Sequence, residues 1–378
     1  MRILPRSGFV QLCIQADAGT VSSLALAIWP ARLNAALARK SYFLLTGGTM
    51  KTTSPIALPE TVRDIFAARH HRLHHALWHG LRDRWNHSSL PEVTKKAIEN
   101  LNWHPPRPAT RWFSGGGMPE TTNGSGVDFL YMHREMIAEF DKAMVNAGAN
   151  SDIGWQVVPE PGRPSSTHPG IDVPTEWELP DGLKWLQRRF AVVKSDEFYW
   201  CRMRWWDRDF HNHGYLRTLS LGQLGSILET SIHNDMHMRW AAAPRDPETD
   251  VVLVLGRPET SIDNKWDAPA YDFLGETYSS HVNPIFWRLH KWVDGIIDEW
   301  FDAHEGHHPG EISKTTLNGV KWFESEGWIE TDSPWSSPSP HAHHDVPSME
   351  KVYRLLYPEA RTFVAIDEST SAPKNWFR

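Results

Sequence analysis

The sequence predicts a mainly α-helical protein with long irregular loops and few short strands. Four segments repeat apolar residues at three- and four-residue intervals, as amphipathic helices do: residues 60–87, 129–144, 221–240 and 284–304. Residues 150–182 are rich in Pro, Gly and Ser, which indicates irregular backbone. The short apolar run DVVLVLG at 250–256 is typical of a strand.

The first predicted helix, over residues 60–87, carries its apolar face on Phe66, Leu73, Leu77 and Leu81. A stripe of His71, His75 and His79 flanks that face at four-residue steps. We interpret this stripe as a solvated or half-buried face, and a surface metal site is the alternative.

Shorter elements lie between and after these helices. The spacing predicts a helix over residues 90–103 that ends before Pro105 and Pro106, because proline restricts the residue before it. The glycine-rich segment 111–126 is predicted as a loop, and it lacks the lysine of a phosphate-binding loop. A last helical segment follows residue 346.

Composition narrows the class of protein. A net charge of −7 without a long basic stripe argues against nucleic acid as a partner, and no apolar run is long enough to predict a membrane span. The chain contains 21 His and 20 Trp but only two Cys, so cysteine-rich metal sites and a disulfide framework are excluded. A bound metal ion would therefore need His and carboxylate ligands.

Changes in composition divide the 378 residues into three parts. Residues 1–54 are predicted to be a disordered leader or an over-called start, because a second Met stands at position 50; a targeting segment is the alternative. Residues 55–305 form the main domain and 306–378 a C-terminal extension. Within the extension, PHAHHD (340–345) is interpreted as a polar linker or as a metal-delivery segment. Without a convincing secretion signal, we expect a cytoplasmic protein.

Four histidines are predicted to face the interior: His133, His233, His237 and His290. His233 and His237 are four residues apart, so both rings project from one face of their helix. Two ligands from one helix and a third from a facing helix are how helical bundles build metal sites, and His290 can supply the third. Three neutral imidazoles without a thiolate suit copper or zinc. The alternative is that each is a hydrogen-bonded core histidine.

The residues around these histidines resemble a known family. SIHNDMHMRW (231–240) resembles the second copper-binding helix of tyrosinases, catechol oxidases and molluscan hemocyanins, with Glu229 as the preceding acidic residue. NPIFWRLHKWVD (283–294) is similar to the same family's signature around its last ligand, with Asn283 where Asp is usual. FLYMHREMIAEFD (129–141) resembles the first-copper signature, with Met132 and Asp141 at variant positions.

The resemblance, which covers residues 90–305, implies an antiparallel four-helix-bundle core carrying a dicopper site. It implies His233, His237 and His290 as the ligands of the second copper, and His104 and His133 as ligands of the first. The remaining first-copper position falls at Asn123 or Gly124, where there is no His. His70, His74 or the run His211-Asn212-His213 could fill this gap, or the first site could be empty.

The resemblance also implies a type-3 copper oxidase that uses O₂ to hydroxylate a phenol or to oxidise a catechol or aminophenol to a quinone. A small phenolic or tyrosine-derived substrate is expected, as in secondary-metabolite tailoring. Asn234 would orient a water molecule that deprotonates the phenol. Asp294 is interpreted as a helix cap or as an orienter of His290, and Arg134 as a structural ion-pair partner. The alternatives are a degenerate relative with one metal or none, and an O₂ carrier.

Overall fold

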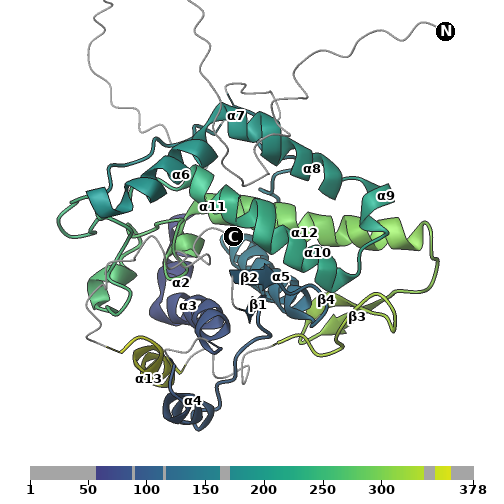
Figure 1. Cartoon of the computed structure of the whole chain (residues 1–378), viewed down its shortest axis with the longest axis horizontal. Helices are drawn as coiled ribbons and strands as arrows, with labels where there is room; N and C mark the ends of the chain where they lie inside the picture. The colour runs from purple at the N-terminus through teal and green to yellow at the C-terminus, as the bar shows by residue number, and fades with distance from the viewer. Residues whose placement is uncertain (1–56, 87–89, 114–115, 162–170, 336–344, 359–378) are drawn as a thin grey trace, which may run out of the picture. The chain divides into compact units, whose positions relative to one another are not determined.

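Long helices form the centre of the computed structural model, which describes residues 57–86, 90–113, 116–161, 171–335 and 345–358 (Figure 1). Helix α5 (Ser125–Asn146) packs against both α10 (Leu221–Leu228) and α12 (Pro284–Glu305), and α11 (Asn234–Trp240) packs against α12. The prediction of a mainly helical fold with few short strands is confirmed. The leader predicted over residues 1–54 and most of the segment 340–345 lie outside the described residues.

The helix predicted over residues 60–87 is two helices. Ala68 has extended backbone torsions (φ −60°, ψ 140°), which separates α2 (Glu60–Ala67) from α3 (Arg69–Arg84). The buried guanidinium of Arg72 holds this corner, because its Nε donates to the carbonyl oxygen of Ala67 at 2.7 Å. Helix α4 (Glu92–Glu99) follows within the range predicted for it.

The helix predicted over residues 221–240 is also interrupted. A π-helical turn, η3 (Glu229–His233), joins α10 to α11, and Ser231 inside it has non-helical torsions. The hydroxyls of Thr230 and Ser231 donate to the carbonyl oxygens of Ser226 and Ile227, which satisfies acceptors that the wider turn frees. Turns of this kind often occur at functional sites.

Two glycines bring α5 and α10 into backbone contact. A Cβ atom on Gly126 would lie 2.0 Å from the carbonyl oxygen of Gly222, and one on Gly225 would lie 2.2 Å from that of Gly126. No larger residue fits either position without moving a helix. This contact fixes the separation of the two helices that lead to His133 and His233.

Between α5 and α10 the described residues up to 180 are irregular, as was predicted for residues 150–182. Short helices follow: η1 (Asp181–Leu183), α6 (Lys184–Lys194), α7 (Asp196–Phe198), η2 (Tyr199–Met203), α8 (Arg204–Phe210) and α9 (His213–Leu216). The expected strand at 250–256 is not formed, and among these residues only Val252 makes a β-bridge, to Arg245. The side chains of Val251, Val252 and Val254 are exposed, so this run lacks the buried face that a strand needs. The single turns η4 (Asn264–Asp267) and η5 (Ser280–Val282) precede α12.

Two hairpins complete the secondary structure. Strands β1 (Thr110–Phe113) and β2 (Gly116–Pro119) pair antiparallel within the segment that was predicted as a loop. Strands β3 (Ser313–Leu317) and β4 (Val320–Glu324) pair across Asn318 and Gly319, whose positive φ angles match a type I′ turn. The described elements after residue 305 pack on the helices, since β4 contacts α5, and α13 (Val346–Leu356) contacts α3 and α4.

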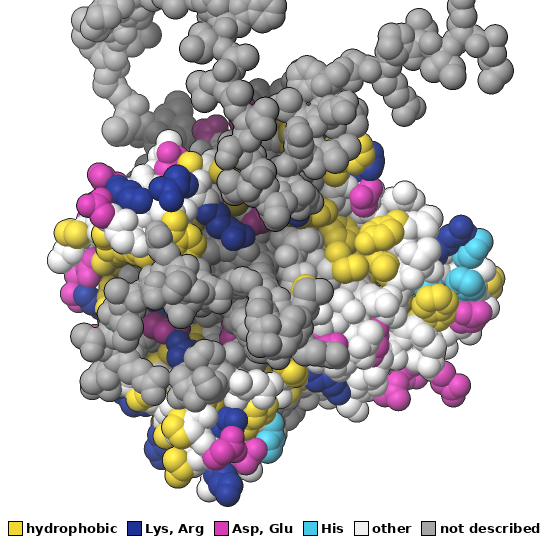
Figure 2. Space-filling model, viewed as in Figure 1, with side chains coloured by type: hydrophobic (Ala, Val, Ile, Leu, Met, Phe, Trp, Pro, Cys, Tyr) yellow, Lys and Arg dark blue, Asp and Glu magenta, His cyan; other side chains and the backbone are white. Residues whose placement is uncertain are grey.

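Tryptophan side chains fill much of the core. Trp78, Trp103, Trp240, Trp287, Trp292 and Trp300 are fully buried, and Trp287 stacks on Phe140 with ring centroids 4.2 Å apart. None of the helices in the described part of the chain has a stretch both long and apolar enough to span a bilayer. On the face in Figure 2, Lys and Arg side chains are interspersed with Asp and Glu.

Candidate metal centre

Helix α3 contributes two histidines to a cluster in the core. His75 is 2% exposed, so the interpretation of the stripe as a solvated or half-buried face is wrong for this residue. The ring centroid of His79 lies 4.9 Å from that of His75, and both rings are near His133 of α5, at 6.3 and 6.4 Å. One ligand nitrogen from each of the three lies within 4.8 Å of the others, close enough to share a metal ion.

A second group comes from the π-turn and from helices α11 and α12. The Nε2 atoms of His233 and His290 lie 3.0 Å apart. Two imidazole nitrogens on one tetrahedral metal ion are about 3.3 Å apart, so this spacing suits a shared ion. The ring centroid of His237 lies 4.7 Å from that of His233 and 5.2 Å from that of His290. The structure therefore gathers the three rings that sequence assigned to one metal. The set whose ligand atoms lie within 4.8 Å of one another is, however, His133, His233 and His290, without His237.

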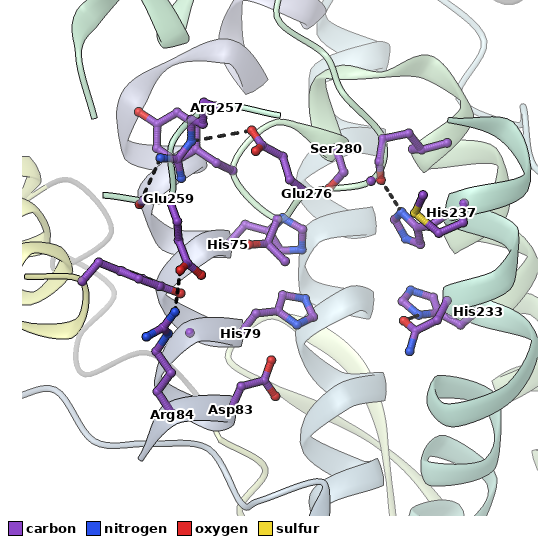
Figure 3. A pocket seen from close by; sticks show the side chains of 18 of the residues that line it. His75, His79, Asp83, Arg84, His233, His237, Arg257, Glu259, Glu276 and Ser280 are labelled. Atoms are coloured by element: carbon purple, nitrogen blue, oxygen red, sulfur yellow. Dashed lines mark hydrogen bonds and ion pairs between the residues drawn. The ribbon is translucent and has the colours of Figure 1, made fainter. Parts of the chain in front are cut away.

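The two groups face each other across the core. The ring of His133 stacks on that of His290 with centroids 4.3 Å apart, and it lies 5.4 Å from that of His233. In Figure 3, His75 and His79 project from α3 toward His233 and His237 on the opposite helix. The six rings thus form one cluster, and His133 is close enough to both sides to belong to either group.

Hydrogen bonds set the orientation of four rings. The Nδ1 atoms of His133 and His290 contact the carbonyl oxygens of Phe129 and Phe286, four residues earlier on their own helices, at 2.8 and 2.7 Å. The Nδ1 atom of His237 contacts the carbonyl oxygen of Leu274 at 2.9 Å, and that of His233 contacts Oδ1 of Asn234 at 3.2 Å. An oxygen acceptor requires a proton on Nδ1, which leaves the Nε2 lone pair free for a metal ion.

Burial keeps the cluster uncharged. It is the main cause that lowers the pKa of His75 to about 3 and that of His237 to about 4. Burial also lowers the pKa of His79, His133, His233 and His290. All six rings are therefore neutral at pH 7, the protonation state in which imidazole binds metal ions. The Nε2 atoms of His75 and His133 are buried and have no hydrogen-bond partner.

Arg82 links the helices that carry these ligands. Its side chain, on α3, forms an ion pair with Glu229 of the π-turn at 2.5 Å and donates to the carbonyl oxygen of Ser125 at the start of α5. Glu229 is the acidic residue that precedes the motif at 231–240. One buried guanidinium thus connects the three segments that hold four of the six histidines.

Three residues of the motifs have structural roles. Asn283 caps α12, since its Oδ1 accepts from the backbone N–H of Ile285, as the Asp that is usual there also could. Arg134 forms ion pairs with Asp294 and Asp298 at 2.6 and 2.7 Å, so its interpretation as a structural partner is confirmed. Asp294 has neither of its two expected roles, because it joins α12 to α5 through Arg134.

The structure does not bring His104 to the cluster. Its side chain is exposed, its carbonyl oxygen accepts from Nε1 of Trp335, and it belongs to neither group of potential ligands. Among the candidates for the missing ligand, His211 is paired with Glu299 at 2.8 Å. His75 and His79 complete the first group. The sequence offered a metal site on their stripe only as the alternative, and at the surface. Their spacing, His-x₃-His, is that of His233 and His237, and this repetition was the available signal.

A pocket of ≈ 340 Å³ opens onto the cluster. Among the histidines, His79 and His237 are partly exposed in it, one from each side. Its outer wall includes Met238, Leu274 and Tyr357. A small aromatic molecule can therefore reach the histidines from solvent.

The chain matches no protein-family model, and no curated protein shows significant similarity to it. The resemblance of the three motifs to copper proteins therefore remains a sequence argument.

Proposed function

We propose that the protein is a dinuclear copper oxidase acting on small phenols or catechols with O₂. The observation that supports it best is the pair of opposed histidine sets. Each combines a His-x₃-His pair with a third His that follows a Phe by four residues. His75, His79 and His133 have ligand atoms within 4.8 Å of one another, and the ring of His237 lies 4.7 Å from that of His233. We propose that this frame is the core of an antiparallel four-helix bundle.

The residues present fit two copper ions. His75, His79 and His133 would hold one ion, and His233, His237 and His290 the other. Neutral imidazoles accept both Cu(I) and Cu(II), and no described carboxylate or thiolate belongs to either ligand group. The unpartnered Nε2 atoms of His75 and His133 would otherwise be buried polar groups without compensation. Zinc suits the same donors, and the experiment below separates the two metals.

Bound copper would supply the electron transfers between substrate and O₂ that no side chain of this cluster can perform. In the net reaction two catechols each lose two electrons and two protons, and one O₂ takes up all four of each to give two water molecules. The chain's part is to admit the ring through the pocket and to hold the imidazoles neutral and oriented. Asn234, at the pocket wall, contacts His233 and would also be positioned to orient a water molecule near a phenol.

The test is O₂ uptake by copper-loaded protein with 4-methylcatechol and 4-methylphenol as substrates. We expect quinone formation with one O₂ consumed per two catechols. His79→Ala and His237→Ala should each abolish turnover, whereas His104→Ala should retain it. Zinc-loaded protein should be inactive. Uptake of O₂ that reverses under vacuum, without quinone, would indicate an O₂ carrier. No activity with two coppers bound would reject the oxidase.

A further inference from the structure

Asp83 lies on the same face of α3 as the two histidines of that helix. His75, His79 and Asp83 are spaced four residues apart, and each step advances about 6 Å along the axis. Figure 3 shows their side chains pointing to the same side, with the carboxylate of Asp83 beyond the ring of His79. All three line the pocket, and the carboxylate is accessible to solvent. Asp83 therefore lies one helical turn outward from the candidate metal centre.

The other charged side chains of the pocket wall are paired. Arg84 forms an ion pair with Glu259 at 2.5 Å, and Arg257 lies 3.6 Å from Glu276. Among the residues that the structure describes, Asp83 has no ion-pair partner. The pocket wall thus contains two ion pairs and the carboxylate of Asp83, which no cationic side chain of the described residues pairs with.

The surroundings of Asp83 favour a cation from outside the protein. Partial desolvation in the pocket wall raises the pKa of the Asp83 carboxyl although the residue keeps exposed surface, and Glu229 and Glu259 act in the same direction against Arg82 and Arg84. A cation beside the carboxylate would stabilise its charged form and reverse this increase. The carboxylate therefore gains more from a cationic ligand than one that already has an arginine partner.

The wall next to Asp83 is shaped by α13. The Tyr357 hydroxyl lies so close to Gly80 that a Cβ atom there would approach it to 2.5 Å. Met238 and Leu274 provide apolar surface elsewhere in the lining. A flat ring can pack on this surface near the histidines while a short chain extends along α3.

We propose that Asp83 binds the ammonium group of an arylalkylamine whose ring lies against the histidine cluster. This proposal rests on the proposed function for the location of the ring. Asp83 is shorter than the two histidines, so its carboxylate is set back from the cluster and leaves room for an ammonium group. A two-carbon chain between ring and nitrogen spans about the one helical turn that separates His79 from Asp83. Arylalkyl carboxylates of the same length would meet uncompensated negative charge.

The experiment is equilibrium binding by calorimetry at pH 8, where Asp83 is largely ionised, with copper-loaded protein. The ligands are 2-phenylethylamine, 2-phenylethanol and 3-phenylpropionate, which have no phenolic hydroxyl and are not turned over. We expect the amine to bind at least tenfold more tightly than the carboxylate. Asp83→Asn should remove most of this preference and leave the alcohol unchanged within twofold. Glu259→Gln, which alters a paired carboxylate of the same wall, should retain the preference.

Equal affinity of the wild-type protein for amine and carboxylate would overturn the proposal, and this comparison needs no variant. A preference that persists in folded Asp83→Asn would overturn it as well. The results that would reject the proposed function are different from those that would reject this inference. If the protein binds no copper, the same titration on metal-free protein still tests the amine preference. Two bound coppers with catechol turnover but no amine preference would reject this inference alone.

Discussion

At the scale of single residues, His281 is the neighbour that sets the orientation of His75. The two Nδ1 atoms lie 3.2 Å apart in the core, and the backbones of Thr277 and Phe66 also hydrogen-bond the rings of His75 and His281, respectively. In such a contact between two neutral imidazoles, the Nδ1–H of one ring donates and the Nδ1 lone pair of the other accepts. When His75 is the donor, its Nε2 lone pair is free to bind a metal ion, and His281 acts as the acceptor that selects this tautomer.

Replacing His281 with Leu should therefore weaken one metal site only. We expect the affinity of the site formed by His75, His79 and His133 to fall about 10- to 100-fold, because the loss of an orienting partner has effects of this size. The second site should keep its affinity. Competition titration with a Cu(I) chelator measures both, and His104→Ala is the control. Equal weakening of both sites would mean that His281 has only a structural role.

Four of the six clustered histidines could be predicted from sequence because their neighbours form recognisable motifs. For His75 and His79 the available signal was the His-x₃-His spacing, which does not single them out, since HHRLHHALWHG contains five histidines on several faces of one helix. Amphipathic spacing identified Leu73 and Leu77 as buried but could not distinguish a buried flanking His from a solvated one. His104 was assigned from its distance along the chain to His133, and that criterion contains no information on packing.

At the scale of secondary-structure elements, the contact between α5 and α10 controls the distance between the two ligand groups. We expect Gly225→Ala to destabilise the protein by about 1–3 kcal/mol, because its Cβ would press on the backbone of α5. Gly295→Ala is the matched control: this helical glycine of α12 has nothing within 4 Å of its added Cβ. That substitution should stabilise the protein by about 0.5–1 kcal/mol.

Urea unfolding of both variants measures the two free energies. Gly225→Ala should also lower copper affinity, since the helices must separate to accept the methyl group. A stability equal to that of the wild type would show that the two helices are not in tight contact.

The long helices could be predicted from periodicity, but their interruptions could not. Nothing in the apolar spacing of residues 60–87 reports the bend at Ala68, which depends on the hydrogen bonds of Arg72 to distant carbonyl groups. The apolar spacing of residues 221–240 likewise does not predict the π-turn at Glu229–His233, because one additional residue in a turn barely changes the spacing of apolar side chains. The bends and turns that position the ligands therefore arise from tertiary contacts.

At the scale of the whole molecule, His211 contributes a pH-dependent link between α8 and α12. Its ring contacts Asp207 at 3.5 Å and Glu299 at 2.8 Å, and the hydrogen bond to Asp207 is the main cause that raises its pKa. A histidine with a raised pKa stabilises the fold fully below its unfolded pKa of about 6.5, and this contribution is lost as the pH rises through the folded pKa.

His211→Gln should therefore destabilise the protein by about 1 kcal/mol at pH 6 and by less at pH 9. Urea unfolding of variant and wild type at both pH values provides the measurement. His213→Gln, an exposed neighbour, is the control and should have no effect at either pH. A cost for His211→Gln that does not change with pH would show that the ring packs without carrying charge.

The central claim for the whole molecule is that it holds two metal ions between two matching sets of histidines. The most direct test is the number of Cu(I) ions bound per chain after anaerobic reconstitution, for the wild type, His79→Ala, His237→Ala and His104→Ala. We expect two ions for the wild type and for His104→Ala, and one for each of the other two variants. One ion or none in the wild type would contradict it, as would the loss of an ion in His104→Ala.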